Sequence, residues 1–279
     1  MWRFSGPYPS IAYHNARTQL SAILVEQALI QAQIPFDLIF DEHLANLSMY
    51  QVVILPDSEC LADWQLSALR HFVESGGGLV ATEQSGLYDE WRRVRVEPGL
   101  AGLVDAQAKA KAYQERVVGR SVASAKGVRK EFGKGRVVYF LSLAFDGPMP
   151  EAKAYFTIDN RYWKRPANWQ DLCEGIRWAA GGHLPMKIVG PPSLAANLVS
   201  QIEQRRMVLH LVNYAARRGG PVTSVEVKVE LAAGAMLKGI KLLSPDYAES
   251  TMLKGTQEGA VVSFLVPEIR TYLVVVLSW

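Results

Sequence analysis

The sequence predicts an α/β domain with a parallel sheet, followed by a small antiparallel β-sandwich. Three short apolar runs, at residues 36–40, 52–55 and 79–82, have the length and composition of buried parallel strands, and amphipathic helical patterns separate them. From Leu184 onward the helical pattern ends and short strand patterns follow one another. We therefore predict two domains, residues 1–183 and 184–279.

Apolar residues at 3- and 4-residue spacing predict the helices of the first domain, at Arg17–Gln33, Leu61–Ser75 and Trp169–Ala180. Glycines 76–78 end the second helix, because glycine adopts the left-handed capping conformation at little steric cost. A short helical turn is expected to begin at Asp41.

A β-hairpin is predicted where the strand patterns at 128–132 and 136–141 flank Gly133-Lys134-Gly135. In the second domain, residues 222–231 alternate between apolar and charged side chains, which is typical of a half-buried strand. Further strands are predicted at 197–203, 207–213, 236–243, 260–266 and 271–277.

Composition excludes several classes of protein. The chain of 279 residues is 49% hydrophobic with a net charge of +3, and it has no long basic tract for nucleic acid. It has neither a signal-peptide pattern at its start nor an apolar run long enough to cross a membrane. Its two cysteines, Cys60 and Cys173, lie far apart and do not form a disulfide framework. We therefore expect a cytoplasmic protein.

Acidic residues follow two of the predicted strands, at the edge where parallel sheets bind ligands. Asp57 and Glu59 follow one strand, and Glu83, Asp89 and Glu90 follow the next. Such carboxylates could act as a catalytic pair. Alternatively, they could cap helix N-termini, where the helix dipole favours negative charge.

Other chemistry has little support in the sequence. Where related folds place a nucleophile on a strand-to-helix turn, this chain has Glu83 or Gln84, and neighbouring Ser85 has no evident histidine partner. Cys60 lies beside Glu59, whose negative charge disfavours a thiolate. The five histidines lack metal-ligand spacing, and the glycine run precedes a strand instead of opening a helix. No metal or cofactor is therefore expected.

An aromatic-rich segment at 144–169 is a candidate contact surface for a partner or a sugar, because flat aromatic rings suit both. Ordinary packing between the two domains is the alternative interpretation. The aromatic residues singled out there and after the third strand are Tyr88, Trp91, Tyr155, Phe156, Tyr162, Trp163 and Trp169.

Several segments in the same order carry a resemblance to a known family. They are IPFDLIFDEHL, YQVVILPDSECLADWQLSALRHFVESGGGLVATEQSGLYDEW, FGKGRVVYF, IRWAAG and VLHLVNY. Together they resemble the C-terminal half of family-42 beta-galactosidases and related glycoside hydrolases, from about Ala12 to Trp279. There, a catalytic (β/α)8 barrel precedes a flavodoxin-like, class I glutamine-amidotransferase-like trimerisation domain with helices on both faces of its sheet, and a β-sandwich closes the chain.

The resemblance implies a non-catalytic module for assembly, because the catalytic glutamates of that family belong to the barrel. It also implies a homo-oligomer, such as a trimer, or a glycosidase barrel on another chain as partner, with carbohydrate as a further ligand. The alternative is a stand-alone amidotransferase-like hydrolase. Its site would lie near Asp57, Cys60, Glu83 and Tyr88, with Cys60 and Glu83 as the catalytic candidates.

Overall fold

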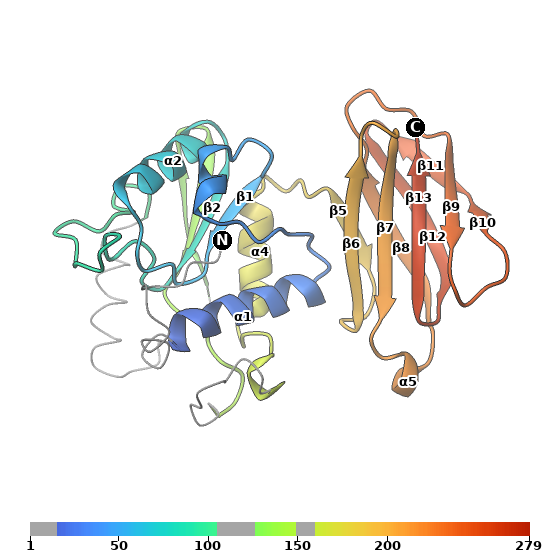
Figure 1. Cartoon of the computed structure of the whole chain (residues 1–279), viewed down its shortest axis with the longest axis horizontal. Helices are drawn as coiled ribbons and strands as arrows, with labels where there is room; N and C mark the ends of the chain where they lie inside the picture. Colours follow the sequence, from blue (N-terminus) through green and yellow to red (C-terminus); the bar gives the residue numbers. More distant parts are fainter. Residues whose placement is uncertain (1–15, 105–125, 149–159) are drawn as a thin grey trace. The chain divides into compact units, whose positions relative to one another are not determined.

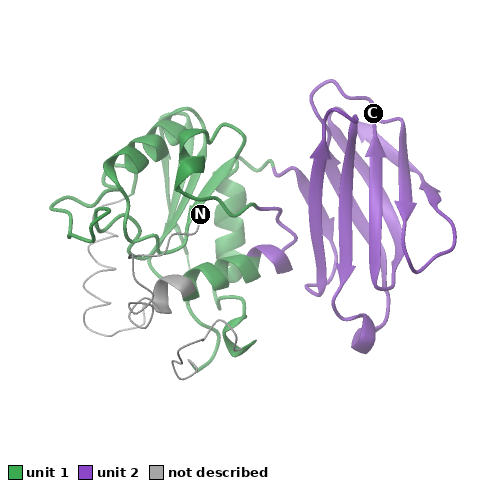
Figure 2. Cartoon of the chain, in the orientation of Figure 1, with its two compact units in different colours: residues 1–28, 37–183 green, residues 29–36, 184–279 purple. Residues whose placement is uncertain are grey.

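The computed structural model describes residues 16–104, 126–148 and 160–279 (Figure 1). The chain divides into two units, which are coloured separately in Figure 2. The first unit comprises residues 1–28 and 37–183, and the second comprises residues 29–36 and 184–279.

The first unit is built on a four-stranded mixed sheet. Its strands are β1 (Val52–Leu55), β2 (Gly78–Thr82), β3 (Val128–Phe132) and β4 (Gly135–Phe140), in the order β1-β2-β4-β3. Strands β1, β2 and β4 run parallel, and β3 pairs antiparallel with β4 as the predicted hairpin. The predicted parallel α/β core is thus confirmed.

Helices pack on both faces of this sheet. They are α1 (Ala16–Gln31), α2 (Asp63–Glu74) and α4 (Trp169–Ala179), with short 3-10 helices η2 (Asp41–Ala45) and η4 (Asn160–Tyr162). Leu69 and Val73 of α2 share a buried cluster with Leu79 of β2. On the other face α4 approaches β4 closely, since a Cβ added at Gly175 would lie 3.0 Å from the Phe140 ring. No helix in the described ranges has the length and apolar character to cross a membrane.

The predicted strand at residues 36–40 is wrong. Ile39 is buried and joins the core cluster, but Phe36, Leu38 and Phe40 are 39%, 49% and 50% exposed. Within the described sheets, no strand includes these residues. Their apolar composition favours an extended backbone, but a strand also needs a neighbour with which to exchange hydrogen bonds.

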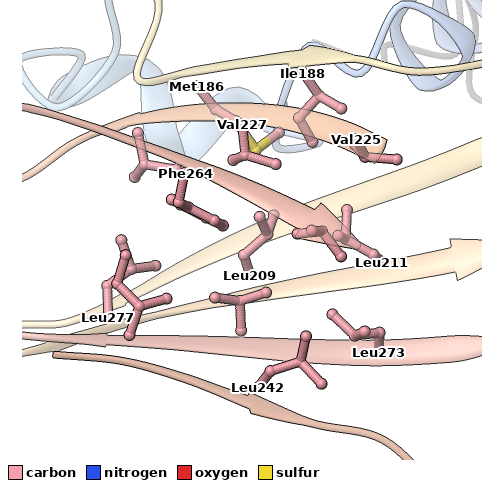
Figure 3. Packing of buried hydrophobic residues seen from close by; sticks show 14 of the residues in the cluster. Met186, Ile188, Leu209, Leu211, Val225, Val227, Leu242, Phe264, Leu273 and Leu277 are labelled. Carbon is pink, nitrogen blue, oxygen red and sulfur yellow. The ribbon is translucent and has the colours of Figure 1, made fainter. Parts of the chain in front are cut away.

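The second unit is a β-sandwich of two antiparallel sheets, as predicted. The sheet orders are β10-β9-β13-β7-β6 and β11-β12-β8-β5. Figure 3 shows apolar side chains from both sheets meeting in a common core. The bounds are β5 (Met186–Val189), β6 (Leu194–Gln201), β7 (Arg206–Asn213), β8 (Val222–Glu230), β9 (Gly239–Leu243), β10 (Thr251–Leu253), β11 (Gly255–Glu258), β12 (Val261–Ile269) and β13 (Tyr272–Ser278).

The alternation in β8 has the predicted effect, because Val225, Val227 and Val229 are buried while the charged residues between them face outward. Three strands, β5, β10 and β11, and the short helix α5 (Ala216–Gly219) were not predicted. These elements have only three or four residues each, too few to show a periodic pattern.

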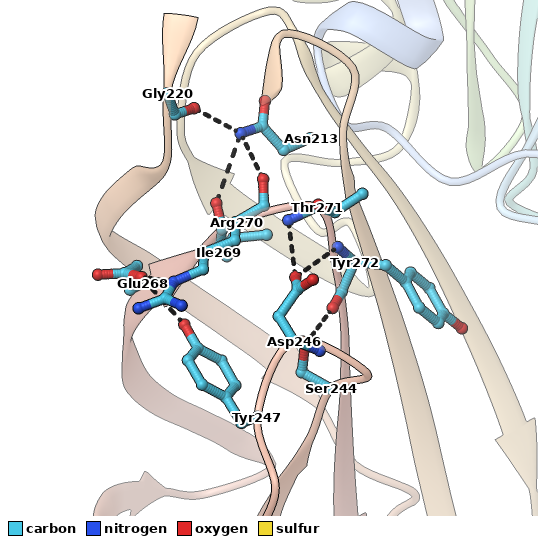
Figure 4. A network of polar contacts seen from close by, with 10 residues as sticks. All are labelled: Asn213, Gly220, Ser244, Asp246, Tyr247, Glu268, Ile269, Arg270, Thr271 and Tyr272. Atoms are coloured by element: carbon cyan, nitrogen blue, oxygen red, sulfur yellow. Dashed lines mark hydrogen bonds and ion pairs between the residues drawn. The ribbon is translucent and has the colours of Figure 1, made fainter. Parts of the chain in front are cut away.

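A polar network joins three loops of the sandwich (Figure 4). The side-chain amide of Asn213 donates hydrogen bonds to the carbonyls of Gly220 at 2.9 Å and Arg270 at 3.0 Å. The Asp246 carboxylate accepts a hydrogen bond from the Thr271 amide at 2.9 Å. Because Asn213 is only 3% exposed, these carbonyls provide the partners that its buried amide needs.

We expect Asn213→Ala to lower the free energy of unfolding by about 2 kcal/mol, because the carbonyls of Gly220, Ile269 and Arg270 lose their donor. Asn213→Asp should cost more, since a carboxylate cannot donate and adds a negative charge beside carbonyl oxygens. Urea unfolding followed by circular dichroism measures both, with exposed Asn197→Ala as the matched control. Equal stability of Asn213→Asp and the parent would contradict this assignment.

Cys173 on α4 is fully buried, and burial raises the pKa of its thiol to about 11. This pKa lies above that of an unfolded thiol. The contribution of the protonated Cys173 thiol to the free energy of unfolding is therefore fully present below about pH 8 and is lost as pH rises through 11. Between these limits the parent should lose roughly 3 kcal/mol of unfolding free energy relative to Cys173→Ala. Denaturant titrations of both proteins at several pH values test this, and parallel pH dependences would refute it.

Candidate functional site

Two left-handed residues lie at the carboxyl ends of neighbouring parallel strands. Asp57 follows β1 with φ of 52°, and Glu83 follows β2 with φ of 53°. For a residue with a Cβ this conformation costs about 1–2 kcal/mol. The candidate site therefore contains two strained turns at the sheet edge where α/β proteins bind ligands. Of the two residues predicted for the central position of the second turn, Glu83 occupies the left-handed conformation.

The two turns cap each other. The Thr82 hydroxyl accepts a hydrogen bond from the Asp57 amide at 2.9 Å, and the Asp57 carboxylate accepts one from the Gln84 amide at 2.8 Å. Asp57 is 1% exposed. Its carboxylate therefore faces the backbone of the adjacent turn, which is a structural role for a residue considered as a possible catalytic acid.

Ser85 forms hydrogen bonds to the same two strand ends. Its hydroxyl lies 2.7 Å from the Thr82 carbonyl and 2.9 Å from the Leu55 carbonyl, and it accepts a hydrogen bond from the Ser58 amide at 3.0 Å. The side chain is completely buried. These contacts place the Ser85 hydroxyl inside the fold, between the ends of β1 and β2.

Glu83 is held by strand β4 of the sheet and by helix α1. Its amide donates to the Phe140 carbonyl at 2.8 Å, and its carbonyl accepts a hydrogen bond from the Tyr139 hydroxyl. Its carboxylate accepts a hydrogen bond from the Ser21 hydroxyl of α1. The position that carries a nucleophile in related folds thus has a carboxylate that is directed to a helix of the same unit.

The chain continues to pair beyond β1 and β2. The Tyr88 amide donates to the Glu59 carbonyl at 3.0 Å, the Leu61 amide donates to the Tyr88 carbonyl at 3.1 Å, and Cys60 forms a parallel bridge with Tyr88. This pairing brings the strand-end segments with Asp57, Cys60, Glu83 and Tyr88 together, as the hydrolase hypothesis requires. Cys60, however, is 6% exposed.

Open depressions in this unit are lined by other residues. One, of about 510 Å³, is lined by residues such as Leu66, Arg70 and Val96. Another, of about 520 Å³, is lined by residues such as Tyr50, Lys134 and Arg136. Among the described residues, no group of three or more histidine, cysteine, aspartate or glutamate side chains could hold a metal ion.

The predicted aromatic residues differ in exposure. Trp91 is 73% exposed and Trp163 is 39% exposed, whereas Tyr162 is only 4% exposed. Tyr162 packs against Ile23, and its ring lies 6.4 Å from the Phe145 ring, so it is part of the packing of the first unit. The guanidinium of Arg165 lies 4.2 Å from the centre of the Trp169 ring. Tyr155 and Phe156 lie outside the described residues.

Sequence reasoning missed Ser21 and Tyr139, the two hydroxyl groups that hold Glu83. Ser21 had a weak signal, because it is a single polar residue in the apolar stretch Ser21–Val25, all of which is buried. The sequence had no signal for the role of Tyr139, since its neighbours in β4 predict only a buried strand.

Comparison with known proteins supports the resemblance stated from the sequence. Residues 26–109 match the family model described as the beta-galactosidase trimerisation domain. This match includes β1, α2, β2 and both left-handed turns. No curated protein matches the chain significantly.

Solved structures share the fold at low sequence identity. An alpha-L-fucosidase isoenzyme 2 from Paenibacillus thiaminolyticus is 19% identical with a TM-score of 0.58, over 94% of this chain and 45% of that chain. A beta-galactosidase from Bacillus circulans sp. alkalophilus is 15% identical with a TM-score of 0.55, over 99% of this chain and 39% of that chain. Gan42B, a family-42 beta-galactosidase from G. stearothermophilus, is 13% identical with a TM-score of 0.51, over 91% and 35%.

This chain therefore spans less than half the length of these three proteins. The predicted resemblance to the C-terminal half of family-42 beta-galactosidases is confirmed by the family match and by the fold.

We expect Ser21 and Glu83 to be energetically coupled through their hydrogen bond. In a double-mutant cycle, Ser21→Ala and Glu83→Ala should show a coupling energy of about 1.5 kcal/mol, as is typical when one partner is charged. Urea denaturation of the four proteins measures it. The control is the cycle of Ser21→Ala with Glu90→Ala, in which the exposed Glu90 carboxylate takes the place of Glu83. Additive effects of the first pair would show that the hydrogen bond does not stabilise the turn.

Proposed function

We propose that this chain is the non-catalytic accessory part of a glycoside hydrolase of the beta-galactosidase type, and that its first unit assembles subunits into an oligomer. The observation that carries the proposal is the trimerisation-domain match over residues 26–109, which covers the centre of the α/β unit. The sandwich that follows is consistent with the fold shared with family-42 enzymes.

The geometry at the strand ends supports a structural role for this unit. Asp57 and Glu83 occupy the turns where a hydrolase of related fold would mount its reactive groups. Their carboxylates are directed to the Gln84 amide and to the Ser21 hydroxyl. Such bonds stabilise the turns themselves, so we favour an assembly module over the stand-alone amidotransferase-like hydrolase.

Finer features belong to the same proposal. The mixed sheet with helices on both faces is consistent with a flavodoxin-like, amidotransferase-like ancestry of the first unit. Neither Cys60 nor Cys173 forms a disulfide, which is consistent with a reducing, cytoplasmic location. We propose a homotrimer as the assembly, with a glycosidase barrel as the catalytic partner and carbohydrate as a ligand of the complete enzyme.

The proposal predicts that the chain self-associates and lacks glycosidase activity of its own. Light scattering coupled to gel filtration should give a mass near three times the 30.9 kDa of one chain, falling on dilution. A panel of nitrophenyl glycosides should show no turnover above that of buffer, because the groups at the strand ends are engaged within the fold.

A mixture with a family-42 enzyme of known activity serves as the positive control for the glycoside assay. Turnover by the purified chain, unchanged after a second purification step, would contradict the accessory role. A mass of one chain at every concentration up to the solubility limit would contradict the assembly role.

A further inference from the structure

A short hairpin follows β2 and has an exposed tryptophan at its turn. Tyr88 and Val94 pair as an antiparallel bridge, and the Asp89 amide donates to the Arg93 carbonyl at 3.0 Å. The Arg92 amide returns to the Asp89 carbonyl at 3.0 Å, with Arg92 in the left-handed region at φ of 62°. The turn between these residues carries Trp91. We call residues 88–94 the Trp91 hairpin.

The Asp89 carboxylate organises this hairpin from within. It accepts hydrogen bonds from the amides of Trp91 at 3.0 Å and Arg93 at 2.8 Å, and from the Arg93 side chain at 2.7 Å. Although desolvation acts in the opposite direction, the bonds from Arg93 and Trp91 hold the pKa of Asp89 below its usual value. The backbone on both sides of the tryptophan is therefore fixed before any partner arrives.

The hairpin is also fastened to the body of the first unit. The Arg95 guanidinium donates to the Leu61 carbonyl at 2.7 Å and pairs with the Asp63 carboxylate at 2.6 Å, just where α2 begins. The Arg92 guanidinium lies 5.6 Å from the centre of the Tyr88 ring and 3.4 Å from the Glu59 carboxylate. These contacts connect the hairpin to the paired strand ends.

This rigid support presents apolar surface to solvent. Trp91 is 73% exposed and Val94 is 67% exposed, and Val96 beside them is fully exposed. Exposed tryptophan on a preorganised backbone is typical of the residues that dominate binding energy at protein interfaces, because little conformational entropy is lost on association. An isolated exposed aromatic would need no explanation, but Trp91 lies on a turn with many internal hydrogen bonds.

A depression of about 510 Å³ borders the hairpin, which contributes Asp89, Arg93 and Val94 to its wall. The rest of the lining consists of Arg70, Arg95 and Glu97 with the apolar side chains of Leu66, Val96 and Pro98, and of Gly99 and Ala101. An indole ring suits such a lining, since guanidinium groups stack on aromatic faces and the aliphatic side chains bury the ring edges.

We infer that the Trp91 hairpin binds a second copy of this chain, with Trp91 of one copy entering the arginine-lined depression of the next. This inference rests on the proposed function, because the hairpin and the residues lining the depression fall within the segment that matches the trimerisation domain. A projection on one subunit that enters a cavity on the next is a heterologous contact. Heterologous contacts close into a ring when the rotation between successive subunits permits it, and a trimer is the smallest such ring beyond a pair.

The test is the concentration dependence of the mass of the whole chain, measured by light scattering and analytical ultracentrifugation. Trp91→Ala should raise the dissociation constant of the oligomer at least about thirtyfold, in the range found for hot-spot residues. Val96→Glu, on the cavity side, should weaken association in the same direction. Trp64→Ala is the matched control, because Trp64 is 51% exposed in the same unit and lies outside the hairpin and the cavity lining.

Asp89→Asn tests the positioning role of the carboxylate. It should weaken association by a smaller factor than Trp91→Ala while leaving the indole in place, because the turn becomes less ordered. Circular dichroism should show that all five variants of the series, Trp91→Phe included, keep the secondary structure of the parent. Trp91→Phe keeps an aromatic ring and should therefore retain part of the affinity between copies of the chain. It tests the same contact with a smaller change.

The outcomes separate this inference from the proposed function. If the parent chain oligomerises and Trp91→Ala leaves the dissociation constant unchanged, the hairpin inference is overturned and the assembly role stands. If the parent has the mass of one chain at every concentration, the assembly role itself fails. If galactose protects Trp91 from acrylamide quenching while the mass stays constant, Trp91 is a sugar platform, and the inference is likewise overturned.

Discussion

The mutual capping of two left-handed turns is the constraint on which the first unit depends. Asp57 and Glu83 end adjacent parallel strands in a conformation that L-residues avoid. The strain is offset by hydrogen bonds that cross between the turns, from the Asp57 amide to Thr82 and from the Gln84 amide to Asp57. Breaking either bond would weaken both turns, because each turn supplies a hydrogen-bond partner of the other.

This constraint extends to elements that are distant in the chain. The Tyr139 hydroxyl of β4 and the Ser21 hydroxyl of α1 both bond to Glu83, so the strand and the helix are positioned by one residue. The paired segments beyond the turns then lead into the Trp91 hairpin. The fold thus uses the polar groups at its strand ends for internal support and presents its exposed tryptophan on the segment that follows. These two features are the ones on which the proposed assembly role rests.

The extent to which the sequence predicted the site differed between residues. Asp57, Cys60, Glu83 and Tyr88 were placed at neighbouring strand ends because β1 and β2 were recognisable from local patterns alone. The roles of their side chains were not predictable, since the partner of Glu83 on α1 lies 62 residues away and depends on how the helix packs. Tyr162 and Trp163 adjoin in the sequence, yet one is buried and the other exposed, a difference that packing of Tyr162 against Ile23 decides.

By itself, the sequence determined the elements whose signals are local. Periodic apolar residues specified α2 and α4, alternation specified β8, and the glycines after α2 marked its end. Tertiary structure alone decided whether an extended segment became a strand, because residues 36–40 have the composition of one but gain no neighbour in the described sheets. It also decided which residue adopts the left-handed turn and where its carboxylate binds. Those outcomes depend on hydrogen bonds between segments far apart in the chain, and no local pattern records such bonds.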